Sequence, residues 1–139
     1  WNGDSIQFGL YLVDGDEFVA IGDAGVNFHE FIIAKLDNGK IGTYMNKVQT
    51  TAQTPRLLET AETALVRGDG VTTYEVSIPW AEITKDCWIP FKAETGVKIG
   101  FSILWNDDDG DGRRGWMEYA SGIGQFKDAS QFTFLNLVK

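Results

Sequence analysis

The sequence predicts an all-β fold, an antiparallel β-sandwich of the jelly-roll-like or immunoglobulin-like two-sheet type. Two observations predict this class. Apolar residues alternate with polar or small residues over many short stretches, a period that places them on one face of a strand. Glycine, aspartate and asparagine gather between these stretches, where they favour tight turns. Many short strands joined by turns are typical of β-sandwiches.

The first half of the chain predicts four strands. In the first of them, Ile6, Phe8, Leu10 and Leu12 occupy alternate positions, which gives the strand one strongly apolar face. Turns rich in aspartate and glycine follow the first and third strands. The expected strands are residues 6–13, 17–22, 26–36 and 40–48.

The second half begins with a segment that suits a loop or an edge strand, because residues 49–56 are rich in threonine and glutamine and contain a proline. The Gly-Asp-Gly sequence at 68–70 predicts a β-hairpin, although the composition of 57–65 also suits a helix. Pro79 ends the second hairpin strand, and residues 80–83 are expected to form one short helical turn. The further expected strands are residues 63–67, 71–78, 97–106, 113–119 and 131–138.

The tryptophans have different expected places. Trp80 follows a strand-ending proline, and Trp105 belongs to an alternating apolar stripe, so both are expected to fill the core. Alternation puts Trp116 on the same strand face as Glu118.

An acidic turn lies between the last two long strands of this prediction. Its residues fit the template D-x-D-x-D-G-x5-E of a calcium loop, since they are Asp107, Asp109, Asp111, Gly112 and Glu118. Closely spaced carboxylates on a tight turn supply the oxygen ligands that calcium prefers. The flanking residues alternate like strands, so the turn is not part of a helix-loop-helix hand. We expect a structural calcium ion held by Asp107, Asp109, Asp111 and Glu118; the alternative is a solvated turn neutralised by Arg113 and Arg114.

The composition limits the partners. A net charge of −8 over 139 residues argues against nucleic acid and anionic membranes. No apolar run approaches the ~20 residues that span a bilayer. The length suits a single domain, 1–139. The lone Cys87 cannot form an internal disulfide, and the single His29 excludes a site built from several histidines.

Four segments together resemble, in order, the motifs of family 9 carbohydrate-binding modules, a DOMON-like family of β-sandwiches. The segments are WNGDSIQ at 1–7, YEVSIPW at 74–80, IGF at 99–101 leading into ND at 106–107, and residues 126–137. The resemblance covers nearly the whole chain. It implies a secreted, extracellular or cell-surface module that binds polysaccharide, at the chain ends of glucans such as cellulose or of xylan. Such modules are usually fused to a glycoside hydrolase.

Two features depart from that family. Its members typically carry further strands before the position of Trp1, so the chain is expected to be part of a longer protein or to be completed by strands from a neighbouring segment or subunit. Ile32 and Ala34 are apolar where the family has polar sugar contacts. Either the alignment with the family is shifted at these positions, or the ligand differs from the family's, or sugar binding has been lost.

The resemblance also implies a sugar site. Aromatic rings stack on the apolar faces of a sugar, while amides, carboxylates and arginine hydrogen-bond its hydroxyls. Trp1 matches one of the family's two stacking tryptophans, Phe126 takes the position of the other, and Gln7 stands where the family has a glutamate. Arg114 and Trp116 complete the expected carbohydrate-binding residues. The structural alternatives are a core role for the aromatic residues and a solvated strand face for Gln7.

No catalytic constellation is recognisable. The serines lack a nucleophile-elbow context, and no phosphate-binding glycine loop is present. The sequence therefore predicts a binding module and not an enzyme. One alternative is an extracellular structural or assembly domain without a sugar ligand. The other is haem binding through His29 with Met45 or Met117, an activity known in the broader superfamily.

Overall fold

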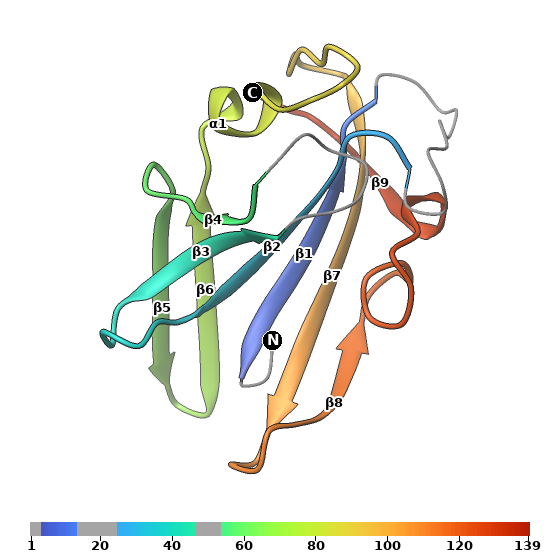
Figure 1. Cartoon of the computed structure of the whole chain (residues 1–139). Coiled ribbons are helices and arrows are strands. Elements are labelled where there is room, and N and C mark those ends of the chain that lie inside the picture. The colour runs from blue at the N-terminus through green and yellow to red at the C-terminus, as the bar shows by residue number, and fades with distance from the viewer. Residues whose placement is uncertain (1–3, 14–24, 47–53) are drawn as a thin grey trace.

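The computed structural model describes residues 4–13, 25–46 and 54–139, and these form an all-β structure (Figure 1). The strands are β1 (Ser5–Tyr11), β2 (Phe28–Lys35), β3 (Ile41–Asn46), β4 (Arg56–Leu57), β5 (Glu62–Gly68), β6 (Val71–Ser77), β7 (Lys98–Asp108), β8 (Arg113–Glu118) and β9 (Thr133–Asn136). The short helices are α1 (Trp80–Thr84) and the 3₁₀ turn η1 (Ala129–Gln131).

The strands form two antiparallel sheets of unequal size. The larger has seven strands in the order β4-β3-β2-β1-β7-β8, with β9 pairing to the first part of the long strand β7. The smaller is the two-stranded hairpin β5–β6. Its residue Thr63 joins Thr43 of β3 through their hydroxyls, 2.7 Å apart. The predicted all-β, sandwich-like class is confirmed.

The alternation in β1 decides which face of the large sheet meets the hairpin. Ile6, Phe8 and Leu10 are buried in a core that also contains Phe31 of β2. Tyr74 of β6 packs against the same core. We call this face of the large sheet the inner face and the opposite one the outer face.

A second apolar cluster lies on the outer face. It includes Phe28 of β2 and Leu104 of β7, and the segment after β8 covers them with Phe132. The rings of Phe28 and Phe132 meet edge to face with centroids 5.1 Å apart. Gly9 permits this packing, because a Cβ there would collide with the Phe132 ring and crowd the Phe28 ring. The segment after β8 is therefore fixed on the outer face.

The hairpin between β5 and β6 has the turn that its sequence predicts. Asp69 and Gly70 both have positive φ angles, 51° and 76°, as a two-residue type I′ turn requires. The helical alternative for residues 57–65 is wrong, since β4 and β5 occupy its two ends.

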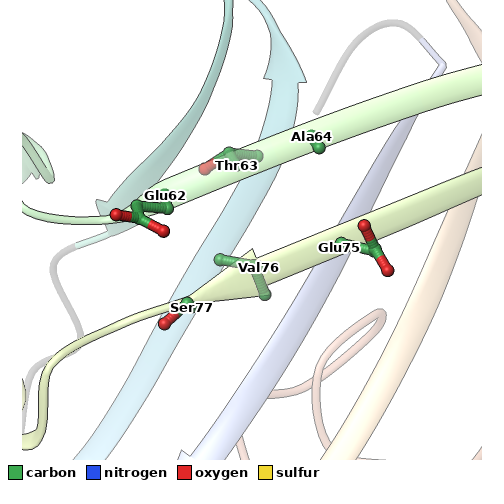
Figure 2. Close-up of a pocket in the computed structure, with 6 residues that line it drawn as sticks. All are labelled: Glu62, Thr63, Ala64, Glu75, Val76 and Ser77. Atoms are coloured by element: carbon green, nitrogen blue, oxygen red, sulfur yellow. The ribbon is translucent and has the colours of Figure 1, made fainter.

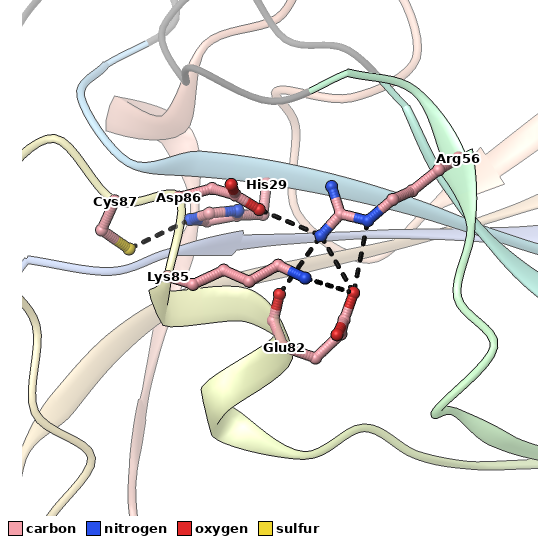
Figure 3. A network of polar contacts seen from close by, with 6 residues as sticks. All are labelled: His29, Arg56, Glu82, Lys85, Asp86 and Cys87. Carbon is pink, nitrogen blue, oxygen red and sulfur yellow. Dashed lines mark hydrogen bonds and ion pairs between the residues drawn. The ribbon is translucent and has the colours of Figure 1, made fainter.

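Arg56 ties β4 to the helix α1 (Figure 3). Its Nη2 atom lies 3.0 Å from Oε1 of Glu82 and 3.0 Å from Oδ2 of Asp86. Lys85 also contacts Glu82, at 3.0 Å. These hydrogen bonds, from Lys85 first and then Arg56, lower the pKa of Glu82. The predicted helical turn after Pro79 is present as α1, and among the described residues no helix has the length and apolar character needed to cross a membrane.

Some expectations need correction. Trp80 and Trp105 do not fill the core, since each is more than a third exposed. Trp105 lies near the end of β7, where no described strand covers the inner face (Figure 1). Trp80 opens α1 and packs beside Phe91 with ring centroids 6.1 Å apart. The last strand is shorter than expected at both ends, since η1 includes residue 131 and β9 spans only Thr133–Asn136. The strand expected at 17–22, the end of the one at 40–48, and Trp1 lie outside the described residues.

Candidate functional site

Buried polar side chains gather on the outer face of the large sheet. They come from three adjacent strands and are Ser5, Gln7, Glu30, Ser102 and Asn106. Strand register explains the grouping, because residues that are paired across neighbouring strands point to the same face of the sheet. Ser5 pairs with Asn106, and Gly9 pairs with both Glu30 and Ser102. Burying polar groups is costly unless they are hydrogen-bonded, so their partners define the site.

A cavity of about 310 Å³ opens at this place. This is near the lower end of the size range of small-molecule sites, roughly 300–1,000 Å³. The residues that line it come from β1, β2, β3, β8 and the segment after β8, and are Gln7, Glu30, Asn46, Arg113, Gly124 and Lys127. We call this the outer-face cavity.

Glu30 is the central charge of the outer-face cavity. Its Oε2 atom lies 2.8 Å from Nζ of Lys127, and its Oε1 atom accepts a hydrogen bond of 3.3 Å from Asn46. Lys127 also donates to the carbonyl oxygen of Ile123 at 2.8 Å. A carboxylate that is 2% exposed is thus paired on both oxygens.

Arg113 holds the other side of the cavity. Its Nη1 atom donates to Oδ1 of Asn106 at 3.0 Å, and Nδ2 of Asn106 donates to Ser5 at 2.9 Å. The guanidinium carbon lies 4.5 Å from the centroid of the Trp116 ring, in cation–π contact. Arg113 therefore helps to position both the Trp116 ring and the Asn106 amide.

Two exposed aromatic residues adjoin residues that line the cavity, Trp116 by contact and Phe126 in the chain. Trp116 follows Arg113 along β8, and its indole nitrogen packs against Gly124, where any Cβ would collide with it. Phe126 precedes Lys127 in the chain and is exposed. The site thus combines exposed aromatic surface with a set of hydrogen-bonding groups.

The structure brings three of the predicted sugar-binding residues to this region. Gln7 lines the cavity, although it is buried rather than solvated. Trp116 contacts the lining residues Arg113 and Gly124, and Phe126 precedes the lining residue Lys127 in the chain. Arg114 is placed elsewhere, since its Nη1 atom lies 3.1 Å from Oδ2 of Asp109. Trp1 lies outside the described residues.

Arg113 lines the cavity in place of Arg114 because of a β-bulge. Asp107 pairs with Gly115, yet Asp108 pairs with Arg113, so Arg114 is the extra residue of β8. A bulge of this kind shifts the alternation by one residue. Arg113 therefore joins the face of Trp116.

The prediction also missed Glu30, Asn46 and Lys127. One signal for Glu30 was present, because a charged residue inside an apolar strand is rarely buried without a partner. Ile32, where the resemblance led us to expect a polar residue, pairs with Gln7 and is buried. It adds apolar surface to the same face.

The acidic turn is organised by its own backbone. Oδ1 of Asp108 accepts hydrogen bonds from the amides of Gly110 and Gly112, at 2.8 and 2.9 Å. Asp4 accepts one from the Asp108 amide at 3.1 Å. Arg114 pairs with Asp109, which is one part of the alternative expected for this turn.

Glu118 does not join the three aspartates of the turn. Its Oε1 atom accepts hydrogen bonds from the amides of Ile123 and Gly124, at 2.6 and 3.1 Å. β8 carries it away from the turn, at about 3.3 Å per residue. Within the described part of the chain, this structure shows no three His, Cys, Asp or Glu side chains already gathered as a metal site. Calcium at Asp107, Asp109 and Asp111 stays a prediction.

A second cavity of about 310 Å³ lies on the hairpin (Figure 2). Its lining comes entirely from β5 and β6 and consists of Glu62, Thr63, Ala64, Glu75, Val76 and Ser77. It holds two carboxylates and no aromatic or basic side chain among these residues. It is chemically less suited to a sugar than the outer-face cavity.

His29 and Cys87 meet on the inner side of the large sheet (Figure 3). Nε2 of His29 lies 3.4 Å from Sγ of Cys87. Burial, helped by the charge of Asp86, raises the pKa of the Cys87 thiol to about 11. Cys87 is therefore a protonated thiol at neutral pH and a poor nucleophile. Of the two methionines considered as haem ligands, Met45 is buried and Met117 is exposed.

No protein-family model, curated protein or solved structure gives a significant match to this chain.

Proposed function

We propose that this chain is a non-catalytic carbohydrate-binding module that anchors or targets a secreted protein to polysaccharide. The observation that carries the proposal is the outer-face cavity, where amide, carboxylate and basic side chains converge beside exposed aromatic rings. Glucan or xylan chain ends are the proposed ligands, an expectation that comes from the family resemblance.

The chemistry of the cavity suits a sugar. Each sugar hydroxyl can both donate and accept, and the amides of Gln7 and Asn46 offer both kinds of partner. Glu30 accepts, while Arg113 and Lys127 donate, so hydroxyls of either orientation find a partner. The charged groups are already paired within the protein. They can therefore bind a neutral ligand without leaving an isolated charge.

The aromatic residues supply the apolar part of recognition. Trp116 is held by Arg113 and is 44% exposed, so part of its ring faces solvent. A sugar ring that stacks on it buries C–H groups against the indole face. Phe126 offers a second ring on the segment that carries Lys127.

The proposal includes a structural calcium ion at the acidic turn. It also includes a location outside the cell and, as the typical partner, a glycoside hydrolase fused to the module. Three aspartates in alternate positions support the ion, and the resemblance supports the location. Thermal melting in calcium and in chelator tests the ion. Equal melting temperatures would remove it from the proposal.

Isothermal titration calorimetry with cello- and xylo-oligosaccharides tests sugar binding. Native oligosaccharides and their borohydride-reduced forms are compared, because only a site specific for the reducing end distinguishes them. The variant Trp116→Ala should weaken binding about tenfold, which corresponds to ~1.4 kcal/mol. Trp88→Ala is the matched control, since Trp88 is similarly exposed, at 49%, and does not line the cavity. A folded protein that gives no heat with any of these sugars would contradict the proposal.

A further inference from the structure

The two sheets of the sandwich cover one another incompletely. Seven strands form one layer and two form the other. The hairpin contacts β3 through Thr63 and lies on the β3 side of the large sheet (Figure 1). No described strand lies opposite β8 on the inner face.

Burial on the inner face falls steadily toward β8. Ile33, Ile6, Trp105 and Met117 are successive partners across β2, β1, β7 and β8, so they share one face and one line. Their exposed fractions rise in that order, as 3%, 5%, 37% and 66%. All four are apolar, so the line begins as core and ends as exposed apolar surface.

The edge of the small sheet nearest this surface is β6. Among the described residues only β5 pairs with β6. Gly68 and Val71 close a two-residue hairpin, and hydrogen-bonded pairs alternate from there. Thr72, Tyr74 and Val76 therefore direct their backbone N–H and C=O groups away from β5. Such an edge is a template for a further strand.

We propose that the β6 edge accepts an extended strand from a partner polypeptide, which completes the small sheet and covers Trp105 and Met117. This is β-strand addition, in which backbone hydrogen bonds give affinity and alternate side chains give specificity. The inward side chains of the strand are apolar, because they meet Trp105, Met117 and the exposed side of Val76.

The outward side chains of the partner strand are basic. Glu62 and Glu75 lie on the outward face of the hairpin, as their register with Ser77 and Ala64 requires (Figure 2). The next strand would place its outward residues beside Glu75, and opposite charges on neighbouring strands attract. The net charge of −8 adds to this preference.

A second copy of this chain does not fit the edge. Antiparallel pairing of two β6 strands needs a two-fold axis perpendicular to the small sheet. The large sheet extends past the β6 edge toward β8 (Figure 1). The two large sheets would therefore compete for the same layer. A single strand meets no such obstacle.

Peptide titration with hydrogen exchange tests the proposal. The probe is a synthetic peptide of about nine residues, the length of a long strand, with valine and leucine alternating with lysine and threonine. A peptide of the same composition with its apolar residues in one block is the control. Binding of the alternating peptide should slow exchange of the Thr72, Tyr74 and Val76 amides. The Thr73 and Glu75 amides, which face β5, should exchange slowly with and without peptide.

Variants locate the contact. Val76→Pro removes an outward N–H without touching the bonds to β5 and should weaken peptide binding at least tenfold. Glu75→Lys should weaken it about two- to fivefold, while Glu59→Lys, the same charge change at an exposed site off the hairpin, should leave it unchanged.

Three results would overturn the proposal. The first is that the alternating peptide leaves exchange of the Thr72, Tyr74 and Val76 amides unchanged. The second is that the peptide with its apolar residues in one block binds as tightly as the alternating peptide. The third is that exchange of these amides slows without peptide, when the protein alone dimerises. The sugar titrations do not depend on this edge, so they separate its failure from that of the sugar proposal.

Discussion

Nζ of Lys127 lies 2.8 Å from Oε2 of Glu30, so an ion pair joins the segment after β8 to the middle of the large sheet. The carboxylate is buried, whereas the lysine side chain is 43% exposed. Lys127 also binds the carbonyl oxygen of Ile123 and follows Phe126 in the chain. The ion pair therefore fixes the backbone next to Phe126, an aromatic residue of the proposed site, relative to the large sheet.

Removing the lysine should destabilise the protein. Lys127→Met leaves the Glu30 carboxylate buried with Asn46 as its remaining partner, and we expect the free energy of unfolding to fall by about 1–3 kcal/mol. Because the lysine is partly solvated, the lower end of that range is expected. Urea denaturation measures the change.

Glu30→Gln is the control for that loss. The amide keeps a hydrogen-bonding group of the same shape without a charge that needs compensation. The double variant Glu30→Gln with Lys127→Met should be more stable than Lys127→Met alone, so its loss of unfolding free energy should be smaller than the sum of the two single losses. Additive effects of the two changes would show that the ion pair carries no net coupling.

Gly124 should control the position of Trp116. A Cβ at residue 124 would collide with the indole ring, and the Gly124 amide is held by Glu118, so the ring must move. Gly124→Ala is therefore expected to weaken sugar binding about as much as Trp116→Ala does. Tryptophan fluorescence and calorimetry measure the two effects. Gly68→Ala serves as a control, because residue 68 has no positive φ, has open space where a Cβ would stand and lies outside the cavity.

Much of the fold could be predicted because its signals are local. The alternation at Ile6, Phe8 and Leu10 needs only a window of a few residues, and so does the turn at 68–70; both predictions are confirmed. Burial was harder to predict, because it depends on what the second sheet covers. Trp105 has the alternation of a core residue but lies beyond the hairpin.

The candidate site could be predicted only in part. Gln7 and Phe126 were found by resemblance and Trp116 was a further candidate, whereas Arg113 was missed because a bulge shifts the alternation of β8 by one residue. The pairing of Glu30 with Lys127 joins positions far apart in the sequence. No spacing rule predicts such a contact before the topology is known.

Asp128 should make stability pH-dependent at low pH. It caps η1, where Oδ1 accepts from the Ser130 amide at 3.0 Å and its hydroxyl at 2.6 Å, and Oδ2 accepts from Gln131 at 2.8 Å. These hydrogen bonds, from Ser130 first, lower the pKa of Asp128. The stabilisation is therefore present above the unfolded-state pKa of about 3.9 and is lost as the pH falls through the folded-state value.

Asp128→Asn tests this cap. The variant should lose about 1 kcal/mol of unfolding free energy at neutral pH, and the difference from the unmodified protein should shrink below about pH 4. Denaturation over a series of pH values measures it. A difference that stays constant down to acid pH would assign the loss to packing rather than to the charge.

Cys87 should react slowly with thiol reagents. Burial first, and the charge of Asp86 second, raise its pKa from 9.0 to about 11, so the thiolate fraction near pH 8 falls about 100-fold. Alkylation by iodoacetamide should be slower than that of a free cysteine by about this factor and should recover when urea unfolds the protein. Because the folded-state pKa is raised, the associated stability is present below pH 9 and is lost as the pH rises through about 11. Asp86→Asn should raise the alkylation rate only slightly, since burial is the larger cause. A large increase in that variant would instead make Asp86 the dominant influence on the thiol.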